Sequence, residues 1–241
     1  MSTTLSGRRV VILGGTSGIG LATASLAARQ GAQVVTVSSG TDSAARALAA
    51  LPAGTSAEVA DLRDPAQIAA VFERVGAFDH LVFTAGEPLA LMRLDELDID
   101  AAREFFALRY FGALGAVAAA APLLRPGGSV VLTSGTASSR PGPGWAVAAS
   151  ICGAVEALVR ALAVELAPIR VNAVSAGVVR SPLWSRIEPA ERERMYEQTG
   201  ASLPLGRVGE VAEVAEAYVY LLRQSYATGT VLSVDGGTAL A

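Results

Sequence analysis

The amino-acid sequence predicts an α/β protein with a parallel β-sheet that is covered by helices on both faces. Short, almost continuously apolar runs, such as residues 10–13, alternate with longer stretches of helical periodicity along the whole chain. Strands that are apolar on both sides are typical of parallel sheets buried between helices. The 241 residues contain no linker, repeat or low-complexity segment, so we expect one domain, 1–241.

Prolines mark where several of the expected helices begin and end. Pro65 stands at the first position of a helix, where its missing N–H costs nothing. Pro122 and Pro168 follow the two longest helices, which they cannot continue. Expected strands lie at 10–13, 33–37, 57–60, 80–83, 129–133, 169–174 and 231–234, and expected helices at 18–30, 43–51, 65–75, 98–121, 145–166, 189–198 and 211–223.

The two longest expected helices, 98–121 and 145–166, are apolar and rich in small residues around most of their circumference. This pattern indicates burial on two sides. We expect the pair to form the subunit interface of a homodimer or homotetramer. The alternative is that both helices are buried within the core of one subunit.

Composition excludes several classes of partner. The net charge is −3 with no basic or acidic block, so neither nucleic acid nor a membrane surface is an expected partner. The chain has one cysteine, Cys152, which excludes an internal disulfide and favours a cytoplasmic location. The first residues lack the apolar core of a signal peptide, and no apolar run is expected to span a bilayer. We expect no metal site.

A glycine-rich segment directly after the first strand predicts a dinucleotide site. A strand that leads into closely spaced glycines and then a helix brings backbone N–H groups and the positive helix end to a pyrophosphate. The alternative is a strand–turn–helix connection without a ligand. The residues expected to contact the cofactor here are Gly14, Thr16, Ser17, Gly18, Ile19 and Gly20.

Further motifs follow in the order typical of one family. Asp61-Leu62 follows the third strand, Thr84-Ala85-Gly86 the fourth, and Ala176-Gly177-Val178-Val179-Arg180-Ser181 the sixth, and Asp235-Gly236-Gly237 stands near the end. With the glycine segment, they make the chain resemble the short-chain dehydrogenase/reductase family over essentially its whole length. The resemblance implies a Rossmann-type doubly wound sheet of about seven strands. It also implies cofactor contacts by Asp61, Leu62, Thr84, Ala85, Gly86, Gly177, Val179 and Ser181.

The end of the second strand bears on the choice of cofactor. An acidic residue there would bind the ribose hydroxyls of NAD and repel the 2′-phosphate of NADP. This sequence has Ser38 and Ser39, followed by Gly40 and Thr41, and no arginine beside them. We therefore expect NADP(H) rather than NAD(H). The alternative is that the serines only cap the next helix.

The catalytic residues that the resemblance implies are missing. The family uses Asn, Ser, Tyr and Lys, and the matching positions here hold Arg109, Gly135, Ala148 and Cys152. No tyrosine lies between residues 140 and 160, and all 19 basic residues of the chain are arginines. The usual proton donor and the ammonium group that lowers its pKa are therefore absent.

Two residues are candidate replacements in this site. Arg109 is expected to point toward the cavity where the ammonium group normally lies, where it would polarise a carbonyl or bind an anionic group. A guanidinium does not donate protons near pH 7. Ser134 would hydrogen-bond a substrate oxygen. The alternatives are an Arg109 that pairs with an acid at the surface or interface and a Ser134 bonded to nearby backbone. Cys152 is interpreted as a small buried residue.

Three functions fit this sequence. The first is an atypical NADP(H)-dependent carbonyl or alcohol oxidoreductase. The second is a non-catalytic dinucleotide-binding sensor or partner subunit. The third is a non-redox enzyme, such as a cyclase, dehydratase or isomerase, that uses the same pocket. The segment 182–206 stands where family members carry a variable substrate lid, but its residues do not identify the small-molecule substrate.

Overall fold

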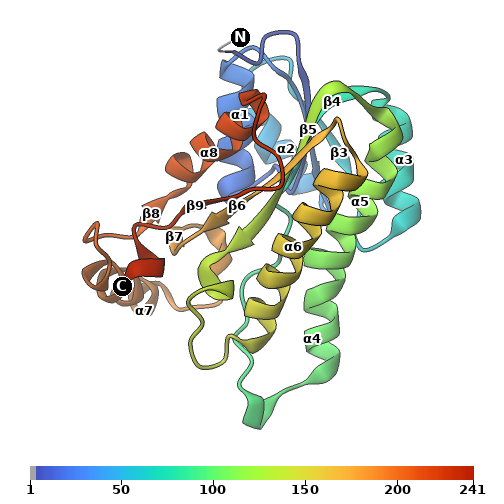
Figure 1. Cartoon of the computed structure of the whole chain (residues 1–241). Helices are drawn as coiled ribbons and strands as arrows, with labels where there is room; N and C mark the ends of the chain where they lie inside the picture. The colour runs from blue at the N-terminus through green and yellow to red at the C-terminus, as the bar shows by residue number, and fades with distance from the viewer. Residues whose placement is uncertain (1–3) are drawn as a thin grey trace.

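A seven-stranded parallel sheet forms the centre of the computed structural model, which describes residues 4–241. The strand order is β3-β2-β1-β4-β5-β6-β9, and helices cover both faces (Figure 1). The predicted fold class is therefore confirmed. The strands are β1 (Arg9–Leu13), β2 (Gln33–Ser38), β3 (Ser56–Val59), β4 (Phe78–Phe83), β5 (Leu124–Gly135), β6 (Arg170–Ala176) and β9 (Val231–Val234).

The helices form one layer on each face of the sheet. One layer contains α1 (Gly18–Arg29), α2 (Thr41–Ala50) and α8 (Val211–Arg223), and the other contains α3 (Pro65–Val75), α4 (Ile99–Phe106), α5 (Ala113–Ala120) and α6 (Ala146–Glu165). Successive β1 side chains enter opposite cores, with Val11 packed toward α3, α5 and α6 and Val10 toward α1 and α8. This alternation explains why the strands are apolar at every position.

The order of the strands reverses between β1 and β4. In this parallel register Leu13 lies beside Val37 of β2 on one side and Phe83 of β4 on the other. The chain continues to β2 and β3 in one direction and, after β4, to β5, β6 and β9 in the other. A crevice at the carboxyl ends of the strands is expected at such a reversal.

The long helix expected at 98–121 contains a change of helical type. Between α4 and α5 the chain forms a π-helical segment, η2 (Ala107–Gly112), which includes Arg109. Such segments are uncommon and are often found at functional sites. The helical stretches Ile99–Leu123 and Ala146–Glu165 are long and apolar enough to cross a membrane by length and composition, contrary to the sequence-based expectation. Both pack one side against the sheet as core helices do.

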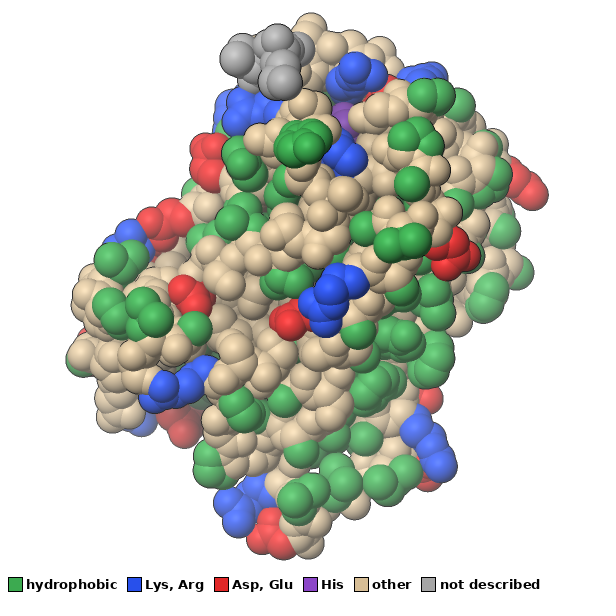
Figure 2. Space-filling model, viewed as in Figure 1, with side chains coloured by type: hydrophobic (Ala, Val, Ile, Leu, Met, Phe, Trp, Pro, Cys, Tyr) green, Lys and Arg blue, Asp and Glu red, His purple; other side chains and the backbone are tan. Residues whose placement is uncertain are grey.

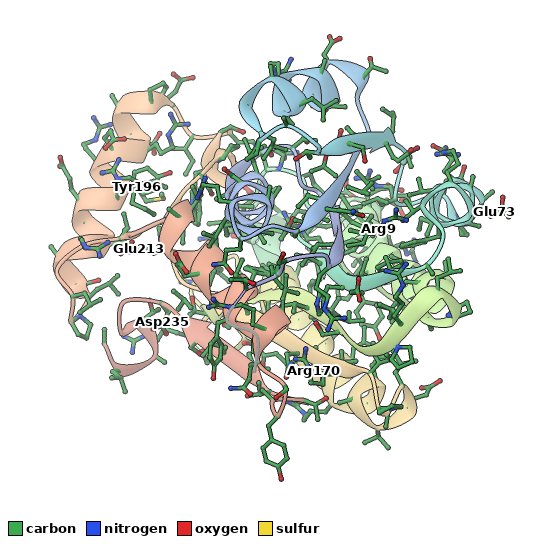
Figure 3. The ribbon with its side chains drawn as sticks, turned by 90° about the horizontal axis from the view of Figure 1, so that it is seen from above. Arg9, Glu73, Arg170, Tyr196, Glu213 and Asp235 are labelled. Carbon is green, nitrogen blue, oxygen red and sulfur yellow. The ribbon has the colours of Figure 1, made fainter. Side chains whose placement is uncertain are left out.

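The last third of the chain adds a small substructure beside the sheet. A two-stranded ladder of β7 (Val179–Arg180) and β8 (Gly209–Glu210) flanks the helix α7 (Pro189–Ser202). Tyr196 of α7 is buried with Trp184 and Val208 in a separate apolar cluster, to one side of the main sheet (Figure 3). The segment predicted as a lid, 182–206, forms most of this substructure, and its role as a lid stays a prediction.

Candidate functional site

The glycine-rich turn after β1 is held in place by backbone contacts. The N–H of Gly14 donates to the carbonyl of Val37 at 2.8 Å, and the N–H of Thr84 donates to the carbonyl of Leu13 at 2.8 Å. A β-carbon at Gly14 would lie 2.5 Å from the backbone nitrogen of Ala85, and one at Gly20 would lie 2.2 Å from the carbonyl oxygen of Gly14. Only glycine allows this close approach of three chain segments.

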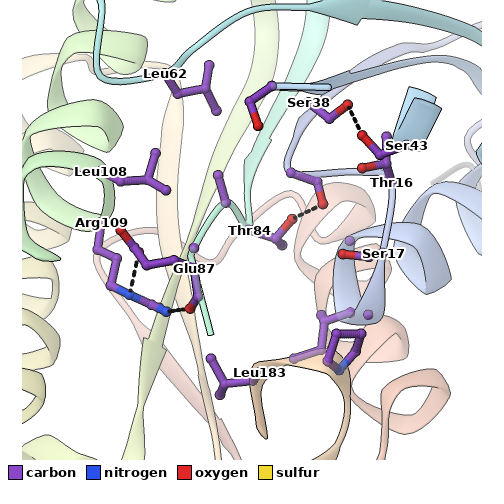
Figure 4. A pocket seen from close by; sticks show the side chains of 18 of the residues that line it. Thr16, Ser17, Ser38, Ser43, Leu62, Thr84, Glu87, Leu108, Arg109 and Leu183 are labelled. Atoms are coloured by element: carbon purple, nitrogen blue, oxygen red, sulfur yellow. Dashed lines mark hydrogen bonds and ion pairs between the residues drawn. The ribbon is translucent and has the colours of Figure 1, made fainter. Parts of the chain in front are cut away.

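The same turn leaves the start of α1 open. Ser17 is the N-cap residue of α1, but its side chain makes no capping hydrogen bond. The first N–H groups of a helix need a partner and carry the positive end of the helix dipole. In this protein the first residues of α1, Gly18, Ile19 and Gly20, line a cavity of about 470 Å³ at the carboxyl ends of β1 and β4 (Figure 4).

The predicted cofactor residues line two adjoining cavities. The large cavity is lined by the glycine turn, by the ends of β2 and β3, by the segment after β4 and by Ser181. Gly177 and Val179 instead line a neighbouring cavity of about 150 Å³. The residues that line the large cavity include Gly14, Thr16, Ser17, Gly18, Ile19, Gly20, Ser38, Ser39, Asp61, Leu62, Thr84, Ala85, Gly86 and Ser181.

These residues fit a dinucleotide. The open helix start suits a pyrophosphate, and a β-carbon at Gly14 or Gly20 would close the turn that forms the cradle. At the far end, Ser38 and Ser39 line the cavity with Ser43, a residue that the sequence did not single out. The Ser38 and Ser43 hydroxyl oxygens lie 3.0 Å apart, and Ser43 donates to the carbonyl of Gly40 at 2.7 Å. Thr41 does not line the cavity.

Arg109 lines both cavities, and Glu87 holds its guanidinium. Arg109 Nε lies 3.2 Å from Glu87 Oε2, and Nη2 donates to the Glu87 carbonyl oxygen (Figure 4). The guanidinium also covers the ring of Phe105, with its central carbon 4.5 Å from the ring centroid. Burial lowers the pKa of Arg109, and the nearby Glu87 carboxylate opposes this effect. Because an arginine pKa lies far above neutrality, Arg109 stays a cation.

Glu87 is a residue that the sequence analysis missed. Its carboxylate lies between two arginines, because Arg63 Nη2 donates to Oε1 at 2.7 Å from the side opposite Arg109. Glu87 directly follows the motif Thr84-Ala85-Gly86, and that position was the only available signal. Its pairing with Arg109, 22 residues later, depends on the fold.

Ser134 lines the small cavity, but its proton is already engaged. Its hydroxyl donates to Glu156 Oε1 at 2.8 Å, and Ser138 donates to the same oxygen at 2.6 Å. Glu156 on α6 was also missed by the sequence analysis. A substrate oxygen beside Ser134 would therefore meet a lone pair rather than a free proton. The alternative expectation for Ser134 is a hydrogen bond to nearby backbone. The corresponding contact joins the Ser134 hydroxyl to the carbonyl oxygen of Cys152 at 3.5 Å.

Ala148 and Cys152 lie one helical turn apart on α6 and line the small cavity with Arg109. Burial raises the pKa of the Cys152 thiol, so the thiol stays protonated at neutral pH. The other walls are largely apolar and aromatic, with Phe105, Trp145 and Trp184 among them. Among the described residues that line this cavity, none is a tyrosine, lysine, histidine or carboxylic acid.

Comparison with known proteins places this arrangement in a family. A family model described as enoyl-(acyl carrier protein) reductase matches residues 14–239. The short-chain dehydrogenase/reductase ATR9 of Stachybotrys chlorohalonatus is 35% identical over 253 residues, which cover 98% of this chain and 99% of that protein.

Solved structures agree with this assignment. The MalC reductase/Diels-Alderase of Malbranchea aurantiaca superposes with a TM-score of 0.91 at 30% identity, covering 98% of both chains. A small-chain dehydrogenase in complex with NADPH superposes with a TM-score of 0.82 at 35% identity, covering 97% of this chain and 99% of that one. With the glycine cradle and the parallel sheet, these matches show that the chain belongs to the short-chain dehydrogenase/reductase family of oxidoreductases.

Proposed function

We propose that this protein is an NADP(H)-dependent reductase that uses Arg109 as an electrophilic group in place of the usual catalytic residues. The observation that carries the proposal is the position of Arg109. Among the residues shared by the walls of the two cavities, it alone is charged. A cation at this junction lies where a nicotinamide in the large cavity would meet a substrate in the small one.

The residues of the chain would divide the work as follows. A bound NADPH supplies a hydride. The glycine turn and the start of α1 hold the pyrophosphate, and Gly177 and Val179 form the wall on the substrate side. Arg109 stabilises the negative charge that develops on the substrate oxygen, while Phe105, Trp145 and Trp184 exclude water and strengthen that interaction. Ser134, whose proton is held by Glu156, forms part of the wall of the small cavity.

Two observations support NADP(H) over NAD(H). Ser38, Ser39 and Ser43 line the end of the cavity where an acidic residue would repel a 2′-phosphate. Asp42, in the first turn of α2, does not line the cavity. In addition, a related structure of 35% identity is described as a complex with NADPH.

Calorimetric titration with NADPH and NADH tests the cofactor assignment. We expect NADPH to bind at least about tenfold more tightly, which corresponds to about 1.4 kcal/mol. The Ser38→Asp variant should reverse the preference, and Ser56→Asp, at an exposed position on β3, is the matched control. Equal binding of both cofactors by the parent protein would contradict the NADP(H) assignment. Binding of NADPH without any turnover would favour a non-catalytic sensor or partner subunit.

We also propose that the chain assembles through the α4–α5 and α6 surfaces. Hydrophobic side chains gather over this part of the molecule (Figure 2). Phe111 in η2 is 61% exposed and Val164 on α6 is 81% exposed, and exposed apolar patches often mark protein–protein interaction sites. The unpaired Cys152 suits a reducing compartment such as the cytoplasm.

A further inference from the structure

The small cavity combines one cation with walls that carry no carboxylic acid, tyrosine, histidine or lysine among the described residues. Arg109 Nη1 has no hydrogen-bond acceptor among the described residues, and Arg109 Nε is one of the few buried polar atoms without a hydrogen-bonded partner. The Ser134 proton points to Glu156, and proton donation by Cys152 would leave a thiolate that burial disfavours. The remaining hydroxyls, such as those of Thr136 and Ser181, hold their protons too tightly to act as acids. The site can therefore stabilise an oxyanion but has no acidic side chain to protonate it.

This combination restricts which carbonyl compounds the site can reduce. Hydride addition to a simple ketone leaves an alkoxide. This anion is about as basic as hydroxide, whose conjugate acid, water, has a pKa near 15.7. Hydride addition to a quinone leaves the monoanion of a hydroquinone, a phenolate whose conjugate acid has a pKa of about 10. The second anion is stable enough to leave the site and take its proton from water.

The walls favour the same class of substrate. Phe105, Trp145 and Trp184 provide flat aromatic surfaces, and Ile151 and Leu183 add apolar contacts. The cavity volume of about 150 Å³ limits the ligand to a small molecule. Aromatic rings pack well against such walls, and a single oxyanion would complement the one positive charge.

We infer that the small cavity takes quinones and similarly conjugated carbonyl compounds, whose reduced form is a stabilised oxyanion bound by Arg109. This inference rests on the proposed reductase function. The hydride, that is two electrons and one proton, forms an O–H bond at one carbonyl oxygen of the quinone, which becomes the hydroquinone monoanion, and NADPH is oxidised to NADP⁺. A second proton comes from solvent, so the products are the hydroquinone and NADP⁺.

A binding experiment tests the anion site without turnover. 4-Nitrophenol bound to the protein should ionise at a pH lower by about 1 or more than free 4-nitrophenol, because an adjacent cation favours the phenolate. The absorbance of the phenolate reports this change. Arg109→Met should abolish the effect, and Arg109→Lys should retain part of it. Arg103→Met removes an exposed arginine of α4 and is the matched control. An unchanged ionisation on binding to the parent protein would overturn the inference.

Kinetics with two substrates of the same bicyclic skeleton test the missing proton donor. We expect NADPH-dependent reduction of 1,4-naphthoquinone. The hydroquinone product is measured, and the rate in the absence of protein is subtracted. For 1-tetralone we expect kcat/KM to be at least about 100-fold lower. Naphthoquinone turnover should show no solvent deuterium isotope effect. The double variant Ala148→Tyr/Cys152→Lys, which adds a proton donor, should raise the ratio of tetralone to naphthoquinone kcat/KM at least about tenfold.

The outcomes separate the inference from the function on which it rests. Comparable reduction of both compounds, or a solvent isotope effect with naphthoquinone, would show that the site delivers a proton. The substrate class would then be wrong while the reductase function would stand. Absence of turnover with both compounds, in a protein that binds NADPH, would overturn the reductase function itself.

Discussion

Arg109 Nε lies 3.2 Å from Glu87 Oε2, and both side chains are 20% exposed. The same guanidinium donates to the backbone carbonyl of Glu87, so one residue holds it through both its side chain and its main chain. Arg63 contacts the other carboxylate oxygen at 2.7 Å. This arrangement fixes the cation at the junction of the two cavities instead of leaving it free to move into solvent.

Replacement of Glu87 by glutamine should weaken this hold on Arg109. The substitution removes the ion pair between the Glu87 carboxylate and Arg109 but keeps the hydrogen bond from Arg109 to the Glu87 main-chain carbonyl. We expect kcat for naphthoquinone to fall roughly tenfold or more, which corresponds to about 1.4 kcal/mol. Glu87 lines the large cavity but lies outside the glycine cradle that holds the pyrophosphate, so the dissociation constant for NADPH should change by less than about threefold. The Glu104→Gln variant is the control, since Glu104 is exposed and lies 4.0 Å from Arg63. An unchanged kcat in Glu87→Gln would show that the Arg109–Glu87 pair has no role in turnover.

Gly86 sets the position of the guanidinium from the other side. A β-carbon at Gly86 would lie 2.6 Å from Arg109 Nη1, so Gly86→Ala must displace the arginine. We expect a loss of naphthoquinone turnover of about tenfold or more, with the fold retained, because a small displacement of a charged group reduces its effect in the transition state. Gly115→Ala on α5 is the control, as its β-carbon would make only an ordinary contact of 3.8 Å with Ile68. Equal losses in the two variants would argue against a specific role of Gly86.

His80 should make stability depend on pH. Burial lowers the pKa of His80 to about 4 in the folded protein, and its Nδ1 lies 2.9 Å from the Ser129 hydroxyl. The unfolded chain, with a histidine pKa of about 6.5, takes up a proton first as the pH falls. The contribution of His80 to the free energy of unfolding is therefore fully present above about pH 6.5. It is lost as the pH falls from 6.5 to 4, which lowers the free energy of unfolding by about 3 kcal/mol at most.

The chain contains one histidine, so nuclear magnetic resonance of a single imidazole can measure the His80 pKa directly. Urea unfolding of the parent and of His80→Gln at pH 7 and pH 4.5 then isolates the contribution of His80 from that of the carboxylates. A measured pKa near 6.5 in the folded protein would contradict this prediction.

Cys152 should react slowly with thiol reagents. Burial raises the pKa of its thiol, and only the thiolate is a strong nucleophile. With Ellman's reagent at pH 8 we expect one slow phase in the folded protein and at least about tenfold faster reaction in urea. The unfolded protein is its own control, because Cys152 is the single cysteine of the chain. Equal rates in both states would show that the thiol is accessible and activated.

The proposed assembly surface gives a further prediction. Phe111→Glu places a charge on an exposed apolar position, which should disrupt a paired-helix interface and increase the monomer fraction measured by light scattering. Leu48→Glu, at a 40% exposed position on α2 in the opposite helical layer, is the control and should not change the mass. A parent protein that is monomeric at micromolar concentration would contradict the proposed assembly.

The order of the elements and the position of the cofactor cradle follow from local patterns in the sequence. Apolar runs and helical periodicity predict the strands and helices to within a few residues, and the glycines at 14, 18 and 20 mark the turn because only glycine permits the close approaches seen there. The absence of lysine from the chain likewise excludes the usual catalytic pair by composition alone.

Only the tertiary structure decided which charges and hydroxyls meet. The pairing of Arg109 with Glu87 and of Ser134 with Glu156 joins residues 22 positions apart in each case, on different elements. Arg109 lies in the π-helical turn Ala107–Gly112, and no periodicity in the sequence marks that turn. Side-chain partners of this kind depend on packing between distant segments, so the sequence identified the cation while the fold determined what holds it and which two cavities it joins.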